Sequence, residues 1–277
     1  MARRALAMMV AIAILSALAF FFYRPTTTSA GMTVHFMDVG QGGGVFIEKD
    51  GQNILYDCGD TFAGKGVLRY LEAHAVKIID FMVISHAHKD HMGGCIDVLK
   101  SQIKVRKVLH NGSNASTNIW TEFLNTARGK AELEQIEHDT KEGGMEILVA
   151  YDSHGRFSKE ADNSILVRLV DGQIQVLLTG DCEAVCEKEI MKESDVKATV
   201  LNVGHHGSNA SSSTPFLNQV APKISVISVG AGNQYGHPTL PALERLAEAK
   251  THVYRTDLNG SVVVNSDGNT VTVDTEK

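Results

Sequence analysis

Three histidines and an aspartate stand close together in one short segment of the chain, as His86, His88, Asp90 and His91. The segment follows an apolar run over residues 78–84 that is typical of a buried strand. Neutral imidazole and carboxylate are the usual ligands of zinc and similar divalent ions. Without a metal, these groups at the end of a core strand would compete for few partners. A histidine-rich surface loop is the alternative interpretation, and we favour a metal site.

Further candidate ligands also stand where predicted strands end. Asp57 ends one predicted strand, Asp181 follows a predicted hairpin, and His205 and His206 follow a third strand. Taken singly, Asp181 is equally explained as a helix N-cap, and the two histidines as loop residues bonded to backbone. A site built at one edge of a sheet would require this recurrence at strand ends. His237, before Pro238, is a further candidate.

Hydrophobic periodicity predicts strands and helices in both halves of the chain. The predicted strands include residues 32–39, 45–48, 53–57, 78–84, 105–109, 147–149, 164–170, 173–179, 198–203 and 224–229. The predicted helices cover residues 66–75, 119–127, 182–192 and 240–249. Two β-rich halves that both carry helices predict two sheets face to face with helices outside. No linker interrupts residues 32–277, which we therefore expect to form one domain.

Composition limits the classes of function. The chain has 277 residues, 43% of them hydrophobic, and a formal net charge of −6. A protein that coats DNA is normally basic, although bound divalent ions would offset the negative charge locally and permit an anionic substrate.

The four cysteines, Cys58, Cys95, Cys182 and Cys186, are too few for a disulfide scaffold. A bond between Cys182 and Cys186, within a predicted helix start, would be strained. Free thiols and long-range pairs both stay open. We expect Cys58 and Cys95 to be packed and not to bind metal.

The first 31 residues form a signal peptide or a membrane anchor with a spacer. Arg3 and Arg4 precede an apolar run over residues 5–23, and a Thr-rich stretch follows. This order is typical of an export signal, and the run is also long enough to span a bilayer, for which ~20 residues suffice. Both alternatives leave the arginines inside and export residues 32–277. We expect an extracellular protein or a membrane-anchored one that faces outside.

The order of the motifs resembles the metallo-β-lactamase fold superfamily. The pattern His86-x-His88-x-Asp90-His91, a later Gly180-Asp181 and a histidine after another strand carry this resemblance. Within the superfamily the chain resembles the hydrolase-like domain of ComEC competence proteins, from about residue 32 to about residue 265. The motifs that carry it are Asp38-Val39-Gly40-Gln41-Gly42, Asp162-Asn163-Ser164, Leu178-Thr179-Gly180-Asp181, His205-His206-Gly207-Ser208, Tyr235-Gly236-His237-Pro238 and Tyr254-Arg255-Thr256-Asp257-Leu258-Asn259-Gly260. Phosphorylcholine esterase modules of some Gram-positive surface proteins are similar too.

The resemblance implies a four-layer αββα sandwich with two divalent metal ions, zinc or alternatively manganese. His86 and His88 would bind the first ion, and Asp90 and His91 the second. Asp181 would bridge the two ions, and His205 or its neighbour His206 would complete the ligand set. Asp57 would orient the histidine loop by hydrogen bonds, and Asn163 is predicted to support the site as well.

The expected reaction follows from the ions. A hydroxide held between two metals is a strong nucleophile at neutral pH, and the same ions neutralise charge on a phosphoryl oxygen. Asp90, His206 and His237 are the predicted catalytic residues, with a protonated imidazole of His206 or His237 assisting the leaving oxygen. His237 is alternatively a metal ligand.

We therefore expect an exported, dinuclear metal-dependent hydrolase that acts on a phosphodiester, either nucleic acid or an envelope polymer. An uncleaved N-terminal segment would add the membrane as a partner. One alternative is a non-catalytic nucleic-acid or envelope binding module of a competence-like DNA-uptake system. Another is a β-lactam or ester hydrolase, which Asn163 disfavours because β-lactam hydrolases carry another histidine in that region.

Two departures from the ComEC pattern qualify this expectation. Gly43 stands where those domains usually carry Asp, so one acidic group near the site is absent. The sequence has a single apolar segment, and we do not expect this chain by itself to form a DNA-uptake channel.

Overall fold

Two β-sheets organise the protein, in the computed structural model that describes residues 31–150 and 157–277. The predicted N-terminal signal or anchor falls outside these described residues. Within them, no helix is both long enough and apolar enough to cross a membrane. Residues 31–277 form one compact unit.

The first sheet has eight strands in the order β15-β14-β1-β2-β3-β4-β5-β6. Its strands are β1 (Met32–Phe36), β2 (Gly44–Lys49), β3 (Gln52–Cys58), β4 (Ile78–Ile84), β5 (Lys104–His110), β6 (Glu132–Gln135), β14 (Val262–Ser266) and β15 (Val271–Thr275). A hairpin joins β2 to β3, and β3, β4, β5 and β6 then run parallel. The C-terminal hairpin β14-β15 adds to the other edge by pairing with β1.

The second sheet has seven strands in the order β13-β12-β11-β10-β9-β8-β7. Its strands are β7 (Thr140–Glu142), β8 (Met145–Val149), β9 (Ile165–Asp171), β10 (Ile174–Leu178), β11 (Val200–Asn202), β12 (Ile224–Ile227) and β13 (His252–Arg255). The hairpin β9-β10 is followed by the parallel strands β11, β12 and β13. Both sheets thus share one plan, a hairpin whose second strand begins a parallel set.

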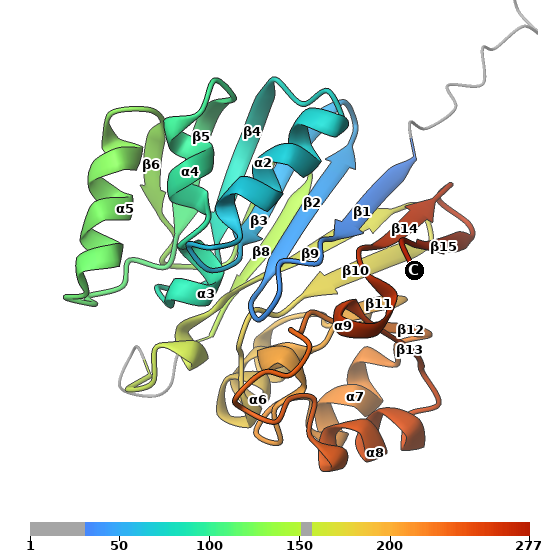
Figure 1. The fold of residues 1–277 in the computed structure, drawn as a ribbon. Coiled ribbons are helices and arrows are strands. Elements are labelled where there is room, and N and C mark those ends of the chain that lie inside the picture. Colours follow the sequence, from blue (N-terminus) through green and yellow to red (C-terminus); the bar gives the residue numbers. More distant parts are fainter. Residues whose placement is uncertain (1–30, 151–156) are drawn as a thin grey trace, which may run out of the picture. The chain divides into compact units, whose positions relative to one another are not determined.

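Helices cover the outer face of each sheet and complete four layers (Figure 1). Those of the first half are α2 (Gly64–Ala73), α3 (Lys89–Met92), α4 (Cys95–Lys100) and α5 (Asn118–Arg128). Those of the second half are α6 (Ala184–Glu193), α7 (Thr214–Val220), α8 (Leu240–Glu248) and the short α9 (Thr256–Asn259), with 3-10 turns η1 (Ala161–Asn163) and η2 (Gly204–Gly207). The predicted mixed α/β fold with two sheets is confirmed.

Three hydrophobic clusters correspond to the three spaces between the layers. The central cluster joins inward side chains of both sheets, such as Val34, Ile54 and Val176. One outer cluster packs the first sheet against α2, α4 and α5, and the other packs the second sheet against α6, α7 and α8. Alternate side chains of a strand point to opposite faces, so a strand such as β3 contributes Ile54 to the central cluster and Leu55 to an outer one.

The parallel strands place the chemistry at one edge. Carboxyl ends of parallel strands in one sheet meet at a common edge, where open α/β sheets bind ligands. Asp57 lies at the end of β3, the histidine segment follows β4, Asp181 follows β10, and His205 and His206 follow β11.

The four cysteines, for which the sequence left free thiols and long-range pairs open, are all buried and form two disulfides. Cys58 forms a disulfide with Cys95, and Cys182 forms one with Cys186. Cys182 precedes the first residue of α6, so helical geometry does not constrain it and the two Cα atoms approach to 5.4 Å. The predicted helix start at Cys182 was wrong, since α6 begins at Ala184, and the argument that a helix start would oppose this bond does not apply.

Candidate metal centre

The histidine segment begins at the end of β4, where Ser85 leads directly into His86. His88 precedes α3, and this single helical turn carries Asp90 and His91. Nε2 of His86 lies 2.9 Å from Nδ1 of His88, and the ring centroids of His86 and His91 are 4.2 Å apart. One strand end and one turn therefore bring all four predicted ligands together.

Two clusters of metal-type ligands result, each with its ligand atoms within 4.8 Å of one another. The first contains His86, His88 and Asp181, and the second contains Asp90, His91 and His206. Three nitrogen or oxygen ligands with a remaining open position are typical of a catalytic metal site. The resemblance implied the same pairing of His86 with His88 and of Asp90 with His91.

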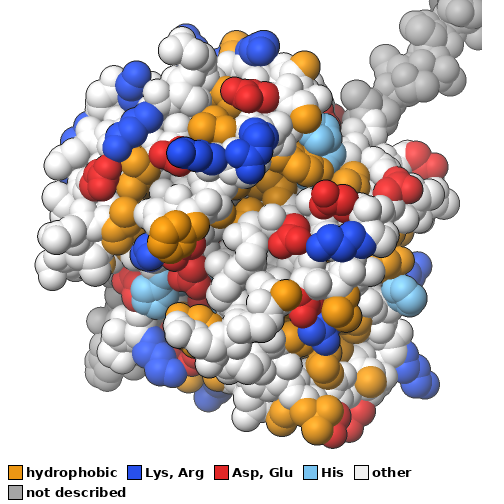
Figure 2. All heavy atoms as spheres, viewed as in Figure 1, with side chains coloured by type: hydrophobic (Ala, Val, Ile, Leu, Met, Phe, Trp, Pro, Cys, Tyr) orange, Lys and Arg blue, Asp and Glu red, His pale blue; other side chains and the backbone are white. Residues whose placement is uncertain are grey.

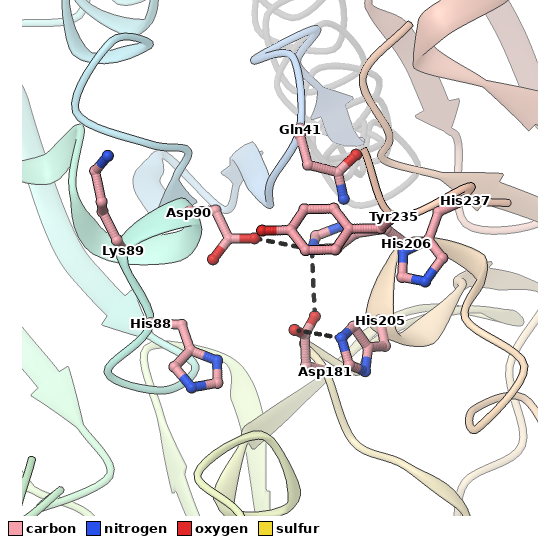
Figure 3. A pocket seen from close by; sticks show the side chains of 9 residues that line it. All are labelled: Gln41, His88, Lys89, Asp90, Asp181, His205, His206, Tyr235 and His237. Atoms are coloured by element: carbon pink, nitrogen blue, oxygen red, sulfur yellow. Dashed lines mark ion pairs between the residues drawn. The ribbon is translucent and has the colours of Figure 1, made fainter. Parts of the chain in front are cut away.

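Asp181 faces both clusters. Its Oδ2 lies 3.6 Å from Nε2 of His86, in the first cluster. Its Oδ1 lies 3.1 Å from Nε2 of His91 and 3.5 Å from Nε2 of His206, in the second. The carboxylate thus directs one oxygen to each cluster, as a bridging ligand would. Figure 3 shows its ion pairs with His205 and His206.

Buried polar atoms without hydrogen-bond partners test whether metal ions fit this site. Among the described side chains, five such atoms occur, and three meet at the second cluster: Nε2 of His91 and Nε2 of His206, which belong to it, and Oδ1 of Asp181, which faces it. Buried polar groups are normally hydrogen-bonded, so each exception needs an explanation. A divalent ion bound to all three atoms would supply one, and the imidazole and carboxylate donors suit zinc. The residues therefore fit the metal that the sequence predicts.

Asp57 fixes the histidine segment through hydrogen bonds to Ser85 and His91. The carboxylate is fully buried and accepts hydrogen bonds from the backbone N of Ser85 at 2.8 Å, from Ser85 Oγ at 2.6 Å and from His91 Nδ1 at 2.8 Å. Because the Ser85 hydroxyl donates to Asp57, its oxygen accepts from Nδ1 of His86 at 3.0 Å. Both rings then carry their proton on Nδ1 and present Nε2 to the clusters, a common arrangement behind metal ligands.

His205 and His206 point in different directions from one turn. Both have positive φ, 49° and 56°, which costs a non-glycine residue about 1–3 kcal/mol. Nδ1 of His206 donates to the carbonyl of Ser228 at 2.8 Å, which directs Nε2 into the second cluster. His205 is partly exposed, with Nδ1 at 3.1 Å from Glu183 Oε1 and Nε2 at 3.5 Å from Asp181 Oδ2.

The resemblance implied that His205 or its neighbour His206 completes the ligand set, and His206 or His237 was predicted to assist the leaving oxygen. The structure places His206 in the buried cluster and His205 at the side of the pocket. The physical reason is that His205 and His206 both adopt left-handed backbone conformations, which no pattern in the sequence predicts.

Asn163 supports a neighbouring loop, and its side-chain hydrogen bonds go to that loop instead of to the clustered ligands. Its side chain accepts from the backbone N of Phe157 at 2.9 Å and donates to the carbonyls of Phe157 and Lys159, both at 2.9 Å. The contact with the ligands comes from Ser164, whose Oγ accepts from the backbone N of Asp181 at 3.1 Å and lies 3.4 Å from Nδ1 of His86.

Three residues that support the site were not predicted from the sequence. Ser85 and Ser164 contact ligands directly, and Glu160 accepts from the backbone N of Ala87, between two ligands, at 3.2 Å. Ser164 lies in the Asp162-Asn163-Ser164 motif, which was the available signal. Gly180 permits the backbone before Asp181 to approach Ser85 closely, because its φ is positive and a Cβ there would lie 2.8 Å from the Ser85 Cβ.

The charges of the site favour cation binding. Burial and the neighbouring charge of His91 lower the pKa of His86 well below its usual range. Burial alone would lower the pKa of His91, but the carboxylates of Asp181 and Asp57 raise it well above its usual range. Burial alone would raise the pKa of Asp181, but the charges of His91, His206 and His86 and a hydrogen bond from His91 together lower it well below its usual range. A metal must therefore displace a proton from His91, and binding will release protons.

A pocket of about 330 Å³ opens above the clusters. Its lining residues are Gln41, His88, Lys89, Asp90, Asp181, His205, His206, Tyr235 and His237. Figure 3 shows Tyr235, His237 and His205 on one side of it and His88 and Lys89 on the other. His237 lies 5.6 Å from His205 between ring centroids, and burial lowers its pKa. Its buried Nδ1 has no hydrogen-bond partner.

Comparison with known proteins identifies relatives of this arrangement. A model of the metallo-beta-lactamase superfamily matches residues 37–231. The chain is 32% identical to Recombination protein 2 of Haemophilus influenzae over 84% of this chain and 28% of that protein. It is 32% identical to Competence protein ComA of Neisseria gonorrhoeae over 90% of this chain and 35% of that protein. The chain thus spans about a third of the length of these curated relatives.

A solved structure supports the fold. Tm1679, a metal-dependent hydrolase of the beta-lactamase superfamily, aligns with a TM-score of 0.53 at 16% identity, over 81% of this chain and 95% of that one. The family match and the competence relatives confirm the resemblance predicted from the motifs.

Proposed function

The chain belongs to the metallo-beta-lactamase superfamily of metal-dependent hydrolases, and we propose that it hydrolyses phosphodiesters with two divalent metal ions, outside the cytoplasm. The observation that carries the proposal is the pair of ligand clusters with Asp181 facing both. Zinc is the proposed metal and manganese the alternative, since imidazole and carboxylate donors suit both.

The proposed ligand set follows the two clusters. His86, His88 and Asp181 would hold one ion, and Asp90, His91 and His206 the other, with Asp181 shared. When bound, two such ions lower the pKa of water and neutralise charge on a phosphoryl oxygen. Asp57 and Ser228 keep the imidazole protons of His91 and His206 on Nδ1, so that each Nε2 is free to act as a ligand.

The imidazole proposed to assist the leaving group belongs to His205, which lies outside the two clusters. Glu183 accepts from Nδ1 of His205 and so fixes this ring with Nε2 beside Asp181 in the pocket. A protonated Nε2 there would donate to the leaving oxygen. His237 faces His205 across 5.6 Å and is the second residue proposed for this step.

Two observations support export. All four cysteines are joined in disulfides, which persist in oxidising compartments and are rare in the cytosol. The sequence begins with Arg3, Arg4 and an apolar run, as an export signal or an anchor would. We propose an extracellular protein, or one that an uncleaved N-terminal segment holds at the membrane.

The substrate proposal is an anionic phosphodiester, nucleic acid or envelope polymer. Relatives named for recombination and competence favour nucleic acid.

The test is turnover of bis-p-nitrophenyl phosphate and of nucleic acid by the zinc- or manganese-loaded protein, with His88→Ala as the inactive control. Turnover that His88→Ala abolishes would support the proposal. Binding of nucleic acid without turnover of any phosphodiester by either protein would favour a non-catalytic binding module instead.

A further inference from the structure

Two aromatic side chains are exposed near the metal pocket: Tyr235 lines it, and Phe62, which lines a separate hollow of about 500 Å³, faces Lys89 of the pocket wall. Among the described residues, Phe62 and Tyr235 are the aromatic members of the exposed large hydrophobic side chains, at 89% and 58% exposure. Burying a Phe side chain would be worth about 1.5–3 kcal/mol, so its exposure at a pocket indicates a binding surface. Resting on the phosphodiesterase function proposed above, we propose that Phe62 and Tyr235 stack nucleobases of a single-stranded nucleic acid whose phosphate enters the metal pocket.

Phe62 is tied to the pocket through Lys89. The Lys89 ammonium lies 5.0 Å from the centroid of the Phe62 ring, and Lys89 stands between the ligands His88 and Asp90 in the pocket wall. Asp60 accepts from the backbone N of Phe62 at 3.4 Å and pairs with Lys89 at 3.1 Å. The ring is therefore held near the pocket with one face towards a cation.

Tyr235 is presented by a loop that Asn233 braces. The Asn233 side chain accepts from the backbone N of Tyr235 at 3.1 Å and of His237 at 3.0 Å, and it donates to the carbonyls of Gly230 and His237. One face of the Tyr235 ring stacks on His237, with centroids 5.8 Å apart and an interplanar angle of 27°. A ring already fixed in this way loses little freedom when a base stacks on it.

A second hollow links the two loops. It measures about 310 Å³, shares Gln41, Asp90 and Tyr235 with the metal pocket, and extends to Asp60. Histidines line the metal pocket but not this second hollow; Figure 2 shows histidine and carboxylate side chains together in a recess of the surface. The side-chain amides of Gln41 and Gln234 line this hollow and offer donors and acceptors to the edge of a base, while Asn233, which also lines it, uses its amide to brace the loop. A chain of nucleotides could therefore pass from one ring to the other through the metal pocket.

The surroundings of the rings favour a base over choline, the other group expected beside an envelope phosphodiester. A quaternary ammonium is recognised by aromatic faces that are free to receive a cation. The Phe62 ring already faces the Lys89 ammonium, which would repel a second cation. A neutral base stacks on the free face, and Lys89, the single Lys or Arg among the described residues lining the metal pocket, attracts the phosphate.

The test compares two substrates of equal length and charge. One is a short single-stranded oligothymidylate, and the other is the same oligomer with abasic tetrahydrofuran units in place of the nucleosides. KM and kcat are measured for the zinc-loaded protein and for Phe62→Ala and Tyr235→Ala. Phe62→Tyr and Tyr235→Phe keep the rings, and Leu258→Ala is a matched control because Leu258 is similarly exposed and lines neither hollow.

Each alanine variant should raise KM for the oligothymidylate roughly 5- to 150-fold, the factor that loss of one stacked base predicts. The abasic oligomer, the ring-keeping variants and Leu258→Ala should show no such change. Unchanged KM values in both alanine variants, with wild-type protein that does cleave the oligothymidylate, would overturn the stacking proposal alone.

Failure of the proposed function is recognised separately. Wild-type protein would then cleave neither oligomer. Fluorescence anisotropy of a labelled oligothymidylate, in EDTA and with retained circular dichroism, measures binding without turnover. If both alanine variants bind the oligothymidylate more weakly than the wild type, the stacking proposal holds even in that case. If both bind it as tightly as the wild type, the stacking proposal is overturned.

Discussion

Replacing Asp57 by Asn tests how the metal ligands are held. In the protein, Asp57 Oδ1 accepts from the backbone N of Ser85, and Oδ2 accepts from Ser85 Oγ and from Nδ1 of His91. Asn preserves the volume and the first of these bonds, but it presents an NH2 group to His91. The His91 proton must then move to Nε2, the atom that faces Asp181 at 3.1 Å and would bind the metal.

The expected effect is a loss of metal affinity. Substitutions behind metal ligands cost about 10- to 100-fold in affinity. At fixed zinc concentration, this factor reduces the zinc-dependent gain in unfolding free energy by about 1.4–2.7 kcal/mol. For a protein of this size, the zinc-induced rise in Tm should shrink by about 3–11 °C.

The assay is thermal unfolding by circular dichroism with and without zinc, alongside competition for zinc with a chromophoric chelator. Asp50→Asn, at the exposed β2-β3 turn, is the matched control and should keep the full zinc-induced rise. A zinc-induced rise in Asp57→Asn equal to that of the wild type would refute the reasoning that Asp57 sets the proton of His91.

Three further predictions concern other parts of the site. Gly43→Ala should weaken zinc binding, because a Cβ there would lie 3.0 Å from His91 Nδ1. Gly66→Ala is the control and should leave zinc binding intact, because the nearest atom to a Cβ there is 4.0 Å away. Equal zinc affinities of the two variants would contradict this prediction. His206→Ala should lose metal, measured by elemental analysis, while His205→Ala should keep it and lose kcat. The reverse result would show that His205, the other residue that the sequence allowed, is the ligand. Replacing Cys58 and Cys95 together by Ala should lower the unfolding free energy by about 4 kcal/mol, against about 2 kcal/mol for Cys182 with Cys186, because loop-closure entropy grows with the sequence separations of 37 and 4. Urea unfolding measures both changes, and equal losses would contradict the entropic argument.

Local sequence determined much of the site. His86 to His91 lie in one continuous segment after a hydrophobic strand, so their proximity required no knowledge of the fold. Asp57 and Asp181 could be placed with them because both end strands, and the carboxyl ends of parallel strands meet at one edge. The two sheets followed from the repeated hairpins in the two halves.

Other features depend on geometry that the sequence does not encode locally. His205 and His206 are adjacent residues of one type, and only two left-handed φ angles decide which ring enters the cluster. Ser85 and Ser164 are common residues whose importance appears only when tertiary contacts bring them to imidazoles. The bond between Cys182 and Cys186 was misjudged because helix starts are the least predictable part of an element.

Metal content of the purified protein tests the central claim most directly. Elemental analysis should find about two divalent ions per chain, and Asp181→Ala should lose both, because Asp181 directs one oxygen to each cluster. A protein that retains no divalent metal after purification and dialysis against zinc would contradict the account.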